Sequence, residues 1–182
     1  AKKFIQEAID EQFKLIMIRP DKVSLAKKMI HEANSKVTIG TVIDFPLGKS
    51  SCKSKMKEAQ KAIEDGADDL DFVCNYEAFK KGKFDLVKEE ILLCTKLGLD
   101  HHKIVKWIIE VAALNHNEII RLSTFIKNCI ITHFKEECYH SVFVKSSTGF
   151  YKTNNNLPNG ATVETIILML ENASPLPIKA AG

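Results

Sequence analysis

Short apolar runs alternate along the chain with longer segments whose apolar residues recur at helical spacing. Residues 15–18 form a run suited to a buried strand, and the segment before them places Ile5 and Ile9 on one helical stripe. This alternation predicts six consecutive strand–helix units. The predicted strands are 15–18, 37–43, 69–74, 104–110, 141–145 and 176–179, and the predicted helices are 3–13, 23–33, 54–65, 84–97, 117–134 and 161–171.

Six such units fit either an open doubly wound sheet or part of a (β/α)8 barrel. An open nucleotide-binding sheet should carry a glycine-rich phosphate turn, yet neither GxGxxG nor GxxxxGK[ST] occurs in the sequence. Ionisable residues recur instead within or at the ends of the predicted strands, where barrel enzymes build their sites. This placement favours a barrel. The residues are Asp44, Asp71, Lys106, Glu110, Lys145 and Lys179.

The chain has 182 residues, whereas a complete barrel typically needs about 250. We therefore expect residues 1–182 to form a single, incomplete TIM-barrel domain. The first strand is expected to be missing, as is the last strand with its flanking helices. No linker divides the units, and the asparagines at 154–156 are predicted to form a solvated loop.

The composition of the chain excludes several classes of function. The chain is 45% hydrophobic and 27% charged, as in soluble globular proteins, and its longest apolar runs are far short of a membrane span. A net charge of +3 is too small for a nucleic-acid footprint but suits a small anionic substrate. The five cysteines include no CxxC pair and the histidines show no ligand spacing, so we expect neither disulfides nor a metal. A cytoplasmic location is expected.

The strand pattern suggests amine chemistry. Side chains alternate along a strand, so Lys106 and Glu110 are expected to share a face and form an ion pair. Lys145 and Lys179 come from two further strands. Lysines that converge on one cavity favour the neutral amine, which is a nucleophile for carbonyl carbon.

A lone lysine at a strand end is usually a solvated rim residue. Lys145 departs from that case because Ser-Ser-Thr-Gly follows it directly, and the backbone N–H groups of such a segment can approach a phosphate. Lys179 precedes Ala-Ala-Gly, which also allows close approach by a ligand, although this signal is weaker.

Five strings together resemble the 2-deoxyribose-5-phosphate aldolase family and occur in that family's order. The resemblance implies a (β/α)8 barrel that reversibly cleaves 2-deoxy-D-ribose 5-phosphate to acetaldehyde and D-glyceraldehyde 3-phosphate, without metal or cofactor, in deoxyribonucleoside catabolism. The strings are TVIDFPLG (41–48), GADDLDFV (66–73), VKWIIE (105–110), VKSSTGF (144–150) and IKAAG (178–182).

Carried over residue by residue, the resemblance makes Lys145 the Schiff-base lysine. Lys179 is then the second lysine, whose charge helps to keep the first one unprotonated, and Asp71 is the acid that moves protons. Asp44 departs from the Gly or Asn that members commonly have, and Met17 replaces a frequent cysteine. Substrate or phosphate contacts are implied for Thr148, Gly149 and Gly182, and supporting roles are expected for Lys106 and Glu110.

Two alternatives stay open. One is another lysine-dependent barrel aldolase, of the transaldolase or sugar-acid aldolase type, and the other is a non-catalytic barrel descendant. Release of acetaldehyde would separate the first from the predicted reaction, and any turnover would separate the second. We expect no nucleic-acid or membrane partner, and the resemblance implies a homodimer.

Overall fold

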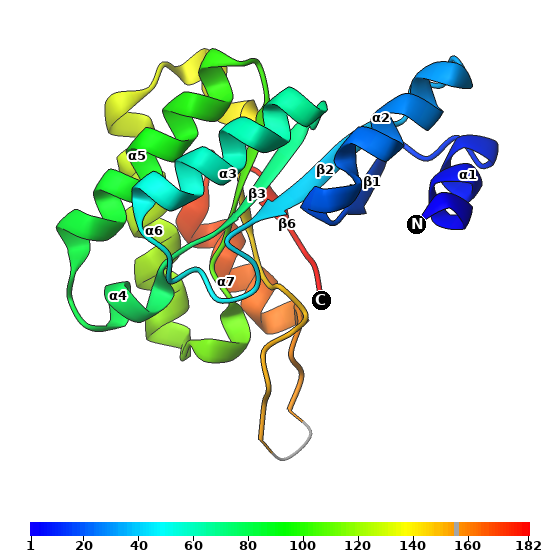
Figure 1. The fold of residues 1–182 in the computed structure, drawn as a ribbon. Coiled ribbons are helices and arrows are strands. Elements are labelled where there is room, and N and C mark those ends of the chain that lie inside the picture. Colours follow the sequence, from blue (N-terminus) through cyan, green and yellow to red (C-terminus); the bar gives the residue numbers. More distant parts are fainter. Residues whose placement is uncertain (155–156) are drawn as a thin grey trace.

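The computed structural model describes residues 1–154 and 157–182 and shows six parallel strands in one curled sheet (Figure 1). Each strand pairs with the next one in the chain, from β1 to β6, and helices lie along the outer side of the sheet. The strands are β1 (Leu15–Ile18), β2 (Thr38–Ile43), β3 (Asp69–Val73), β4 (Ile104–Ile108), β5 (Val142–Lys145) and β6 (Ile178–Lys179). The helices are α1 (Lys2–Asp10), α2 (Val23–Glu32), α3 (Cys52–Asp65), α4 (Tyr76–Lys80), α5 (Phe84–Asp100), α6 (His116–His133) and α7 (Val163–Ala173).

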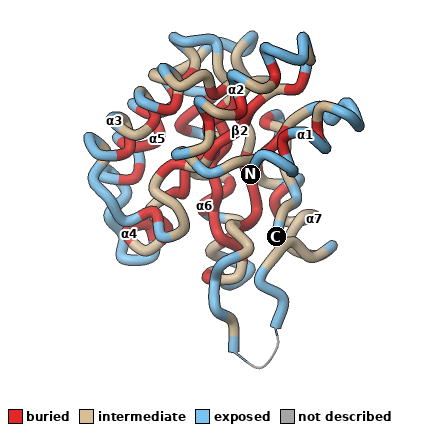
Figure 2. The backbone as a smooth tube through the Cα atoms, turned by 45° about the vertical axis from the view of Figure 1, so that its right-hand side comes forward, coloured by how far each residue is buried: buried red, intermediate tan, exposed pale blue. Residues whose placement is uncertain are grey.

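The two faces of the central strands differ in polarity. On β3 and β4, Phe72 and Trp107 stack with ring centroids 5.1 Å apart, and the Trp107 indole N–H donates to Thr95 Oγ1 of α5 at 3.0 Å. The alternate residues of these strands, including Asp71 and Lys106, therefore face the concave side. Burial is concentrated along the strands and the helix surfaces that cover them (Figure 2). The sheet is thus apolar toward its helices and charged toward its interior.

Local signals set the helix ends. Helix α3 begins after Ser51, whose side chain accepts from the Ser54 N–H, and ends at Gly66, which adopts a left-handed φ of 104°. Helix α6 begins with a capping box between Asn115 and Glu118. These ends fix the loops that precede and follow the neighbouring strands.

The prediction of a parallel strand–helix sheet that curls as part of a barrel is confirmed, with differences at strand ends. Strand β4 ends at Ile108, so Glu110 lies outside it with a left-handed φ of 58°. Ser141 belongs to a 3₁₀ turn that precedes β5. The short helix α4 was not predicted, because five residues give too little periodicity to detect.

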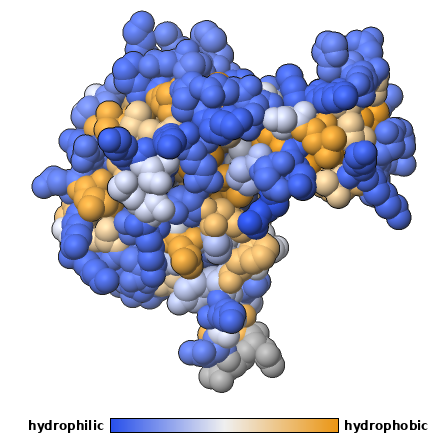
Figure 3. Space-filling view, in the orientation of Figure 1, coloured by the Kyte–Doolittle hydropathy of each residue, from blue (hydrophilic) through white to orange (hydrophobic). Residues whose placement is uncertain are grey.

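The first part of the chain forms an arm with α1, β1 and α2, along which hydrophobic surface is visible (Figure 3). Phe4 and Phe13 are more than two-fifths exposed there. Over the described ranges, no helix combines the length and apolarity needed to cross a bilayer. Of the predicted asparagine loop, residues 155 and 156 lie outside the described residues.

Candidate active site

Asp71 joins two lysines on the concave face of the sheet. Its side chain is fully buried, and its two carboxylate oxygens accept from different ammonium groups. Lys145 Nζ donates to Oδ2 at 2.8 Å, and Lys106 Nζ donates to Oδ1 at 2.9 Å. Lys106 also pairs with Asp69. The structure therefore brings together three residues that the sequence analysis had singled out.

Lys179 lies next to Lys145 on the neighbouring strand. The two residues are register partners between β5 and β6, so their side chains leave the same face of the sheet. Burial lowers the pKa of Lys179; the charges of Lys106 and Lys145 lower it further, while Asp71 and Asp69 oppose the change. Within the described part of the chain, no carboxylate lies at ion-pair distance from the Lys179 ammonium. Lys179 is thus a half-buried cation, and none of the carboxylates in the described ranges pairs with it directly.

Glu110 forms hydrogen bonds with the loop that follows Lys145. Its carboxylate accepts from the Thr148 backbone N–H at 3.3 Å and from the Thr148 hydroxyl. Burial raises the pKa of Glu110, whereas the bonds from Thr148 and the charge of Lys145 lower it. Burial together with the Glu110 charge raises the pKa of Tyr76 to about 12. Glu110 is therefore a buried acid close to the cluster that holds Thr148 in place.

Glycines bring two backbone segments together beside this loop. Gly149 and Gly182 have left-handed φ angles of 78° and 113°, and a Cβ on Gly149 would lie 3.4 Å from Gly182 Cα. Gly160, which the sequence analysis did not identify, lies even closer, because its Cβ would be 2.8 Å from the Gly182 carbonyl carbon. Ser146 Oγ donates to the Ala181 carbonyl at 3.0 Å and accepts from its N–H at 2.9 Å. The predicted phosphate-contacting residues Gly149 and Gly182 are adjacent.

The predicted ion pair between Lys106 and Glu110 is wrong. Glu110 lies two residues beyond the end of β4, and its left-handed backbone directs the carboxylate to Thr148. Lys106 pairs with Asp69 and Asp71 on β3 instead. Register explains this choice, because Asp71 and Lys106 are Cα partners across the two strands.

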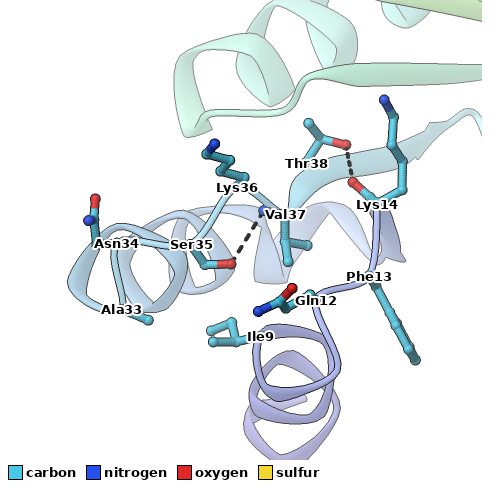
Figure 4. A pocket seen from close by; sticks show the side chains of 10 residues that line it. All are labelled: Ile9, Gln12, Phe13, Lys14, Ala33, Asn34, Ser35, Lys36, Val37 and Thr38. Carbon is cyan, nitrogen blue, oxygen red and sulfur yellow. Dashed lines mark hydrogen bonds between the residues drawn. The ribbon is translucent and has the colours of Figure 1, made fainter.

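A cavity of about 670 Å³ lies away from the lysine cluster (Figure 4). Ile9, residues 12–14 and residues 33–38 line it, next to the first residues of β1 and β2. Lys145, by contrast, is the last residue of β5, at the opposite end of the parallel sheet. Barrel enzymes build their sites at the carboxyl ends of the strands, so we do not assign the reaction to this cavity.

No family model matches the chain. A curated relative, the deoxyribose-phosphate aldolase of Thermococcus gammatolerans, is 38% identical over 181 residues, which cover 99% of this chain and 73% of the relative. Deoxyribose-phosphate aldolase 1 of Staphylococcus aureus strain MSSA476 is 36% identical with the same coverage. The chain belongs to the deoxyribose-phosphate aldolase family. Solved structures agree: "QR15, an Aldolase" superposes with a TM-score of 0.81 at 30% identity, over 98% of this chain and 72% of its own.

Another aldolase structure, from Aeropyrum pernix, has a TM-score of 0.77 at 24% identity and supports the fold. In this member of the deoxyribose-phosphate aldolase family, the Lys145 ammonium donates to a buried carboxylate. Searched over residues 1–154 and 157–182, the structure shows no group of three His, Cys, Asp or Glu side chains arranged to hold a metal ion.

The sequence analysis missed a buried ion pair between Lys55 and Glu90, which lies at the end of β3. A signal was present, since Lys55 occupies the apolar stripe of its helix together with Ala59 and Ala62. Asp44 belongs to the same group, with its carboxylate 3.5 Å from Lys55 Nζ. Asp44 has a left-handed φ of 54°, a conformation that Gly, Asn and Asp adopt more readily than other residues.

Proposed function

We propose that the protein cleaves 2-deoxy-D-ribose 5-phosphate reversibly to D-glyceraldehyde 3-phosphate and acetaldehyde through a Schiff base on Lys145. The observation that carries this proposal is the 2.8 Å contact between Lys145 Nζ and the buried Asp71 carboxylate. A Schiff-base lysine must lose a proton before it attacks, and a carboxylate at this distance can receive that proton. Membership in the aldolase family supplies the substrate class.

In the proposed reaction, the neutral Lys145 amine attacks C1 of the open-chain sugar and forms a carbinolamine. Loss of water gives the iminium, which is the electron sink for the next step. A base removes the proton of the C3 hydroxyl, the C2–C3 bond breaks, and its electrons form an enamine while glyceraldehyde 3-phosphate leaves. Protonation at C2 and hydrolysis then release acetaldehyde and restore the amine.

The remaining residues have supporting roles in this proposal. The Lys179 ammonium disfavours a second positive charge on the adjacent Lys145. Asp71 moves the protons, and Lys106 orients it from its other oxygen. Thr148, fixed by Glu110, and the neighbouring Gly149 and Gly182 provide backbone for the substrate phosphate.

Two further expectations belong to the proposal. The buried apolar residues form one cluster that supports a single domain over residues 1–182. We also propose a homodimer in the cytoplasm; the Aeropyrum pernix protein is described as tetrameric, and light scattering of the full-length protein measures which assembly forms.

Borohydride trapping tests the proposed reaction. The full-length protein is incubated with acetaldehyde and borohydride and then mapped by peptide mass spectrometry. We expect an ethyl group on Lys145, no adduct in Lys145→Met, and an unchanged adduct in Lys152→Met, which alters an exposed lysine in the same loop. Turnover by Lys145→Met should fall by about 10³-fold or more.

An adduct on Lys106 or Lys179 in place of Lys145 would contradict the assignment. A coupled reductase assay then addresses the substrate. Cleavage without release of acetaldehyde would favour a transaldolase or sugar-acid aldolase, and absence of both turnover and adduct would favour a non-catalytic protein.

A further inference from the structure

Lys55 is a fully buried lysine that the proposed reaction does not use. It lies in the first turn of α3, and its side chain has no exposed surface. The ammonium donates to two backbone carbonyls, Gly48 O at 3.1 Å and Val73 O at 2.7 Å. One carbonyl lies in the loop after β2 and the other belongs to the last residue of β3. The lysine therefore ties two neighbouring strand ends together.

Two carboxylates complete the surroundings of Lys55. Glu90 Oε1 lies 2.9 Å from Nζ and also accepts from the Asn75 backbone N–H at 3.1 Å, which links α5 to the segment directly after β3. Asp44 Oδ2 lies 3.5 Å from Nζ and accepts from the Ser50 N–H at 2.8 Å. The ammonium thus connects α5, the end of β3 and both ends of the loop that follows β2.

The loop after β2 lies directly against the end of β3. Gly48 has a φ of 67°, and a Cβ at this position would be 2.6 Å from the Cys74 carbonyl oxygen. Only glycine allows this approach, which brings the Gly48 carbonyl to the same ammonium that binds Val73 O. The hydrogen bonds of Lys55 therefore stabilise a close contact between the loop after β2 and the end of β3.

Stability alone does not account for this arrangement. A buried ion pair loses the hydration of both charges, and apolar residues of similar volume often replace such a pair without loss of stability. Among the described residues, Glu90 Oε2 has no hydrogen-bond partner, which adds to the penalty. The pair does supply directional bonds to several segments at once, and apolar side chains cannot replace those bonds.

We propose that Lys55 is a positioning residue for the aldolase reaction. By fixing the carbonyl of Val73 it holds the end of β3, and Asp71, two residues earlier on that strand, is thereby kept within hydrogen-bond distance of Lys145. Small displacements of a proton-transferring group reduce the rate of the chemical step more than they reduce substrate binding. This inference rests on the proposed function of Asp71 and Lys145.

The test separates activity from stability in the full-length protein. Lys55→Met removes the charge and leaves Glu90 buried without its partner, so both the urea midpoint and kcat should fall. The double variant Lys55→Met/Glu90→Leu removes both charges and should recover most of the midpoint. We expect its kcat to stay about 10- to 100-fold below that of the wild type, with KM within about 3-fold. Lys57→Met, which alters an exposed lysine on the same helix, should match the wild type.

Recovery of kcat together with the midpoint in the double variant would overturn the proposal, since Lys55 would then be purely structural. Should neither of these variants fold, Glu90→Gln keeps the shape of the site and weakens the hold on Lys55. We expect a kcat about 3- to 10-fold lower in that variant, and an unchanged kcat would overturn the proposal equally. A wild-type protein without turnover or a Lys145 adduct would instead contradict the proposed function.

Discussion

Two groups of buried or half-buried lysines lie close to the carboxyl ends of the strands, and the number of carboxylates paired with each lysine differs between them. On the concave face, among the described residues, Lys106 and Lys145 form ion pairs with Asp69 and Asp71, whereas Lys179 forms none. Behind the strands, the single ammonium of Lys55 has four oxygen partners within 3.5 Å, two from carboxylates and two from backbone carbonyls.

In the proposed reaction, this difference separates the nucleophilic lysine from a structural one. The Lys55 ammonium is engaged by two backbone carbonyls and two carboxylates, so all of its contacts are structural. An excess of lysines over carboxylates favours loss of a proton from one of them, and that amine can then attack a carbonyl. Under the proposed function, burial alone therefore does not distinguish the nucleophile from a structural lysine.

Among the changes that compare the two groups, the largest effect should follow from Asp71→Asn. An amide of the same shape cannot accept the proton of Lys145 and leaves two ammonium groups without their shared carboxylate. We expect kcat to fall by about 10²- to 10⁴-fold, measured as retro-aldol turnover in the coupled assay. Asp100→Asn, on the exposed end of α5, is the control. A loss smaller than about 10-fold would mean that Asp71 only supports the site.

Lys179→Leu should show a smaller effect with a defined dependence on pH. Burial lowers the pKa of Lys179 from 10.5, so the folded protein binds fewer protons than the unfolded chain between the lowered value and 10.5. The wild type therefore gains stability as pH rises through this window, whereas the leucine variant lacks this gain. The variant should be relatively most stable at neutral pH, by about 1–2 °C in Tm, and its advantage should shrink toward pH 10.

The same variant should lose about 10²-fold in rate because the repulsion that disfavours protonation of Lys145 is gone. Its activity profile should also move to higher pH, which pH-dependent coupled assays measure. An unchanged profile would leave Lys179 as a residue that only orients its neighbours. Lys152→Leu, in the exposed loop, controls for loss of a positive charge.

The smallest effect should come from Asp44→Asn, which makes the same Asp-to-Asn substitution in the group around Lys55. Lys55 keeps Glu90 and both carbonyls, asparagine tolerates the left-handed backbone, and its amide oxygen can still accept from Ser50. We expect kcat within about 3-fold of the wild type and a loss of about 1 kcal/mol in urea unfolding. A loss comparable to that of Asp71→Asn would remove the distinction between the two groups.

Much of the fold follows from the sequence because strands and helices have different apolar periods. The predicted strand 15–18 coincides with β1, and the register of Lys145 with Lys179 agrees with the pairing expected of consecutive parallel strands. Asp71 and Lys145 were identified because charges inside apolar strands are unusual. The sequence thus predicted the residues of the candidate site better than their contacts.

The contacts that escaped prediction depend on backbone detail or on distant partners. A left-handed Glu110 ends its strand early, and a run of apolar residues gives no sign of this. Lys55 lies on the apolar stripe of its helix, but its partners become evident only when the segments that hold Gly48, Val73 and Glu90 are brought together. The apolar periodicity of a sequence predicts which face of a helix or strand a residue occupies, but it does not predict which distant segment contacts that residue.

Strict alternation along β3, β4 and β5 has a consequence for how the chain can change. Deleting one residue within β4 would turn Trp107 toward the interior and Lys106 toward the helices, so the core and the site would fail together. Insertions and deletions are therefore expected in the loops between these strands and not within them. A change of loop length can reshape the surroundings of the site while the lysine side chains keep their positions.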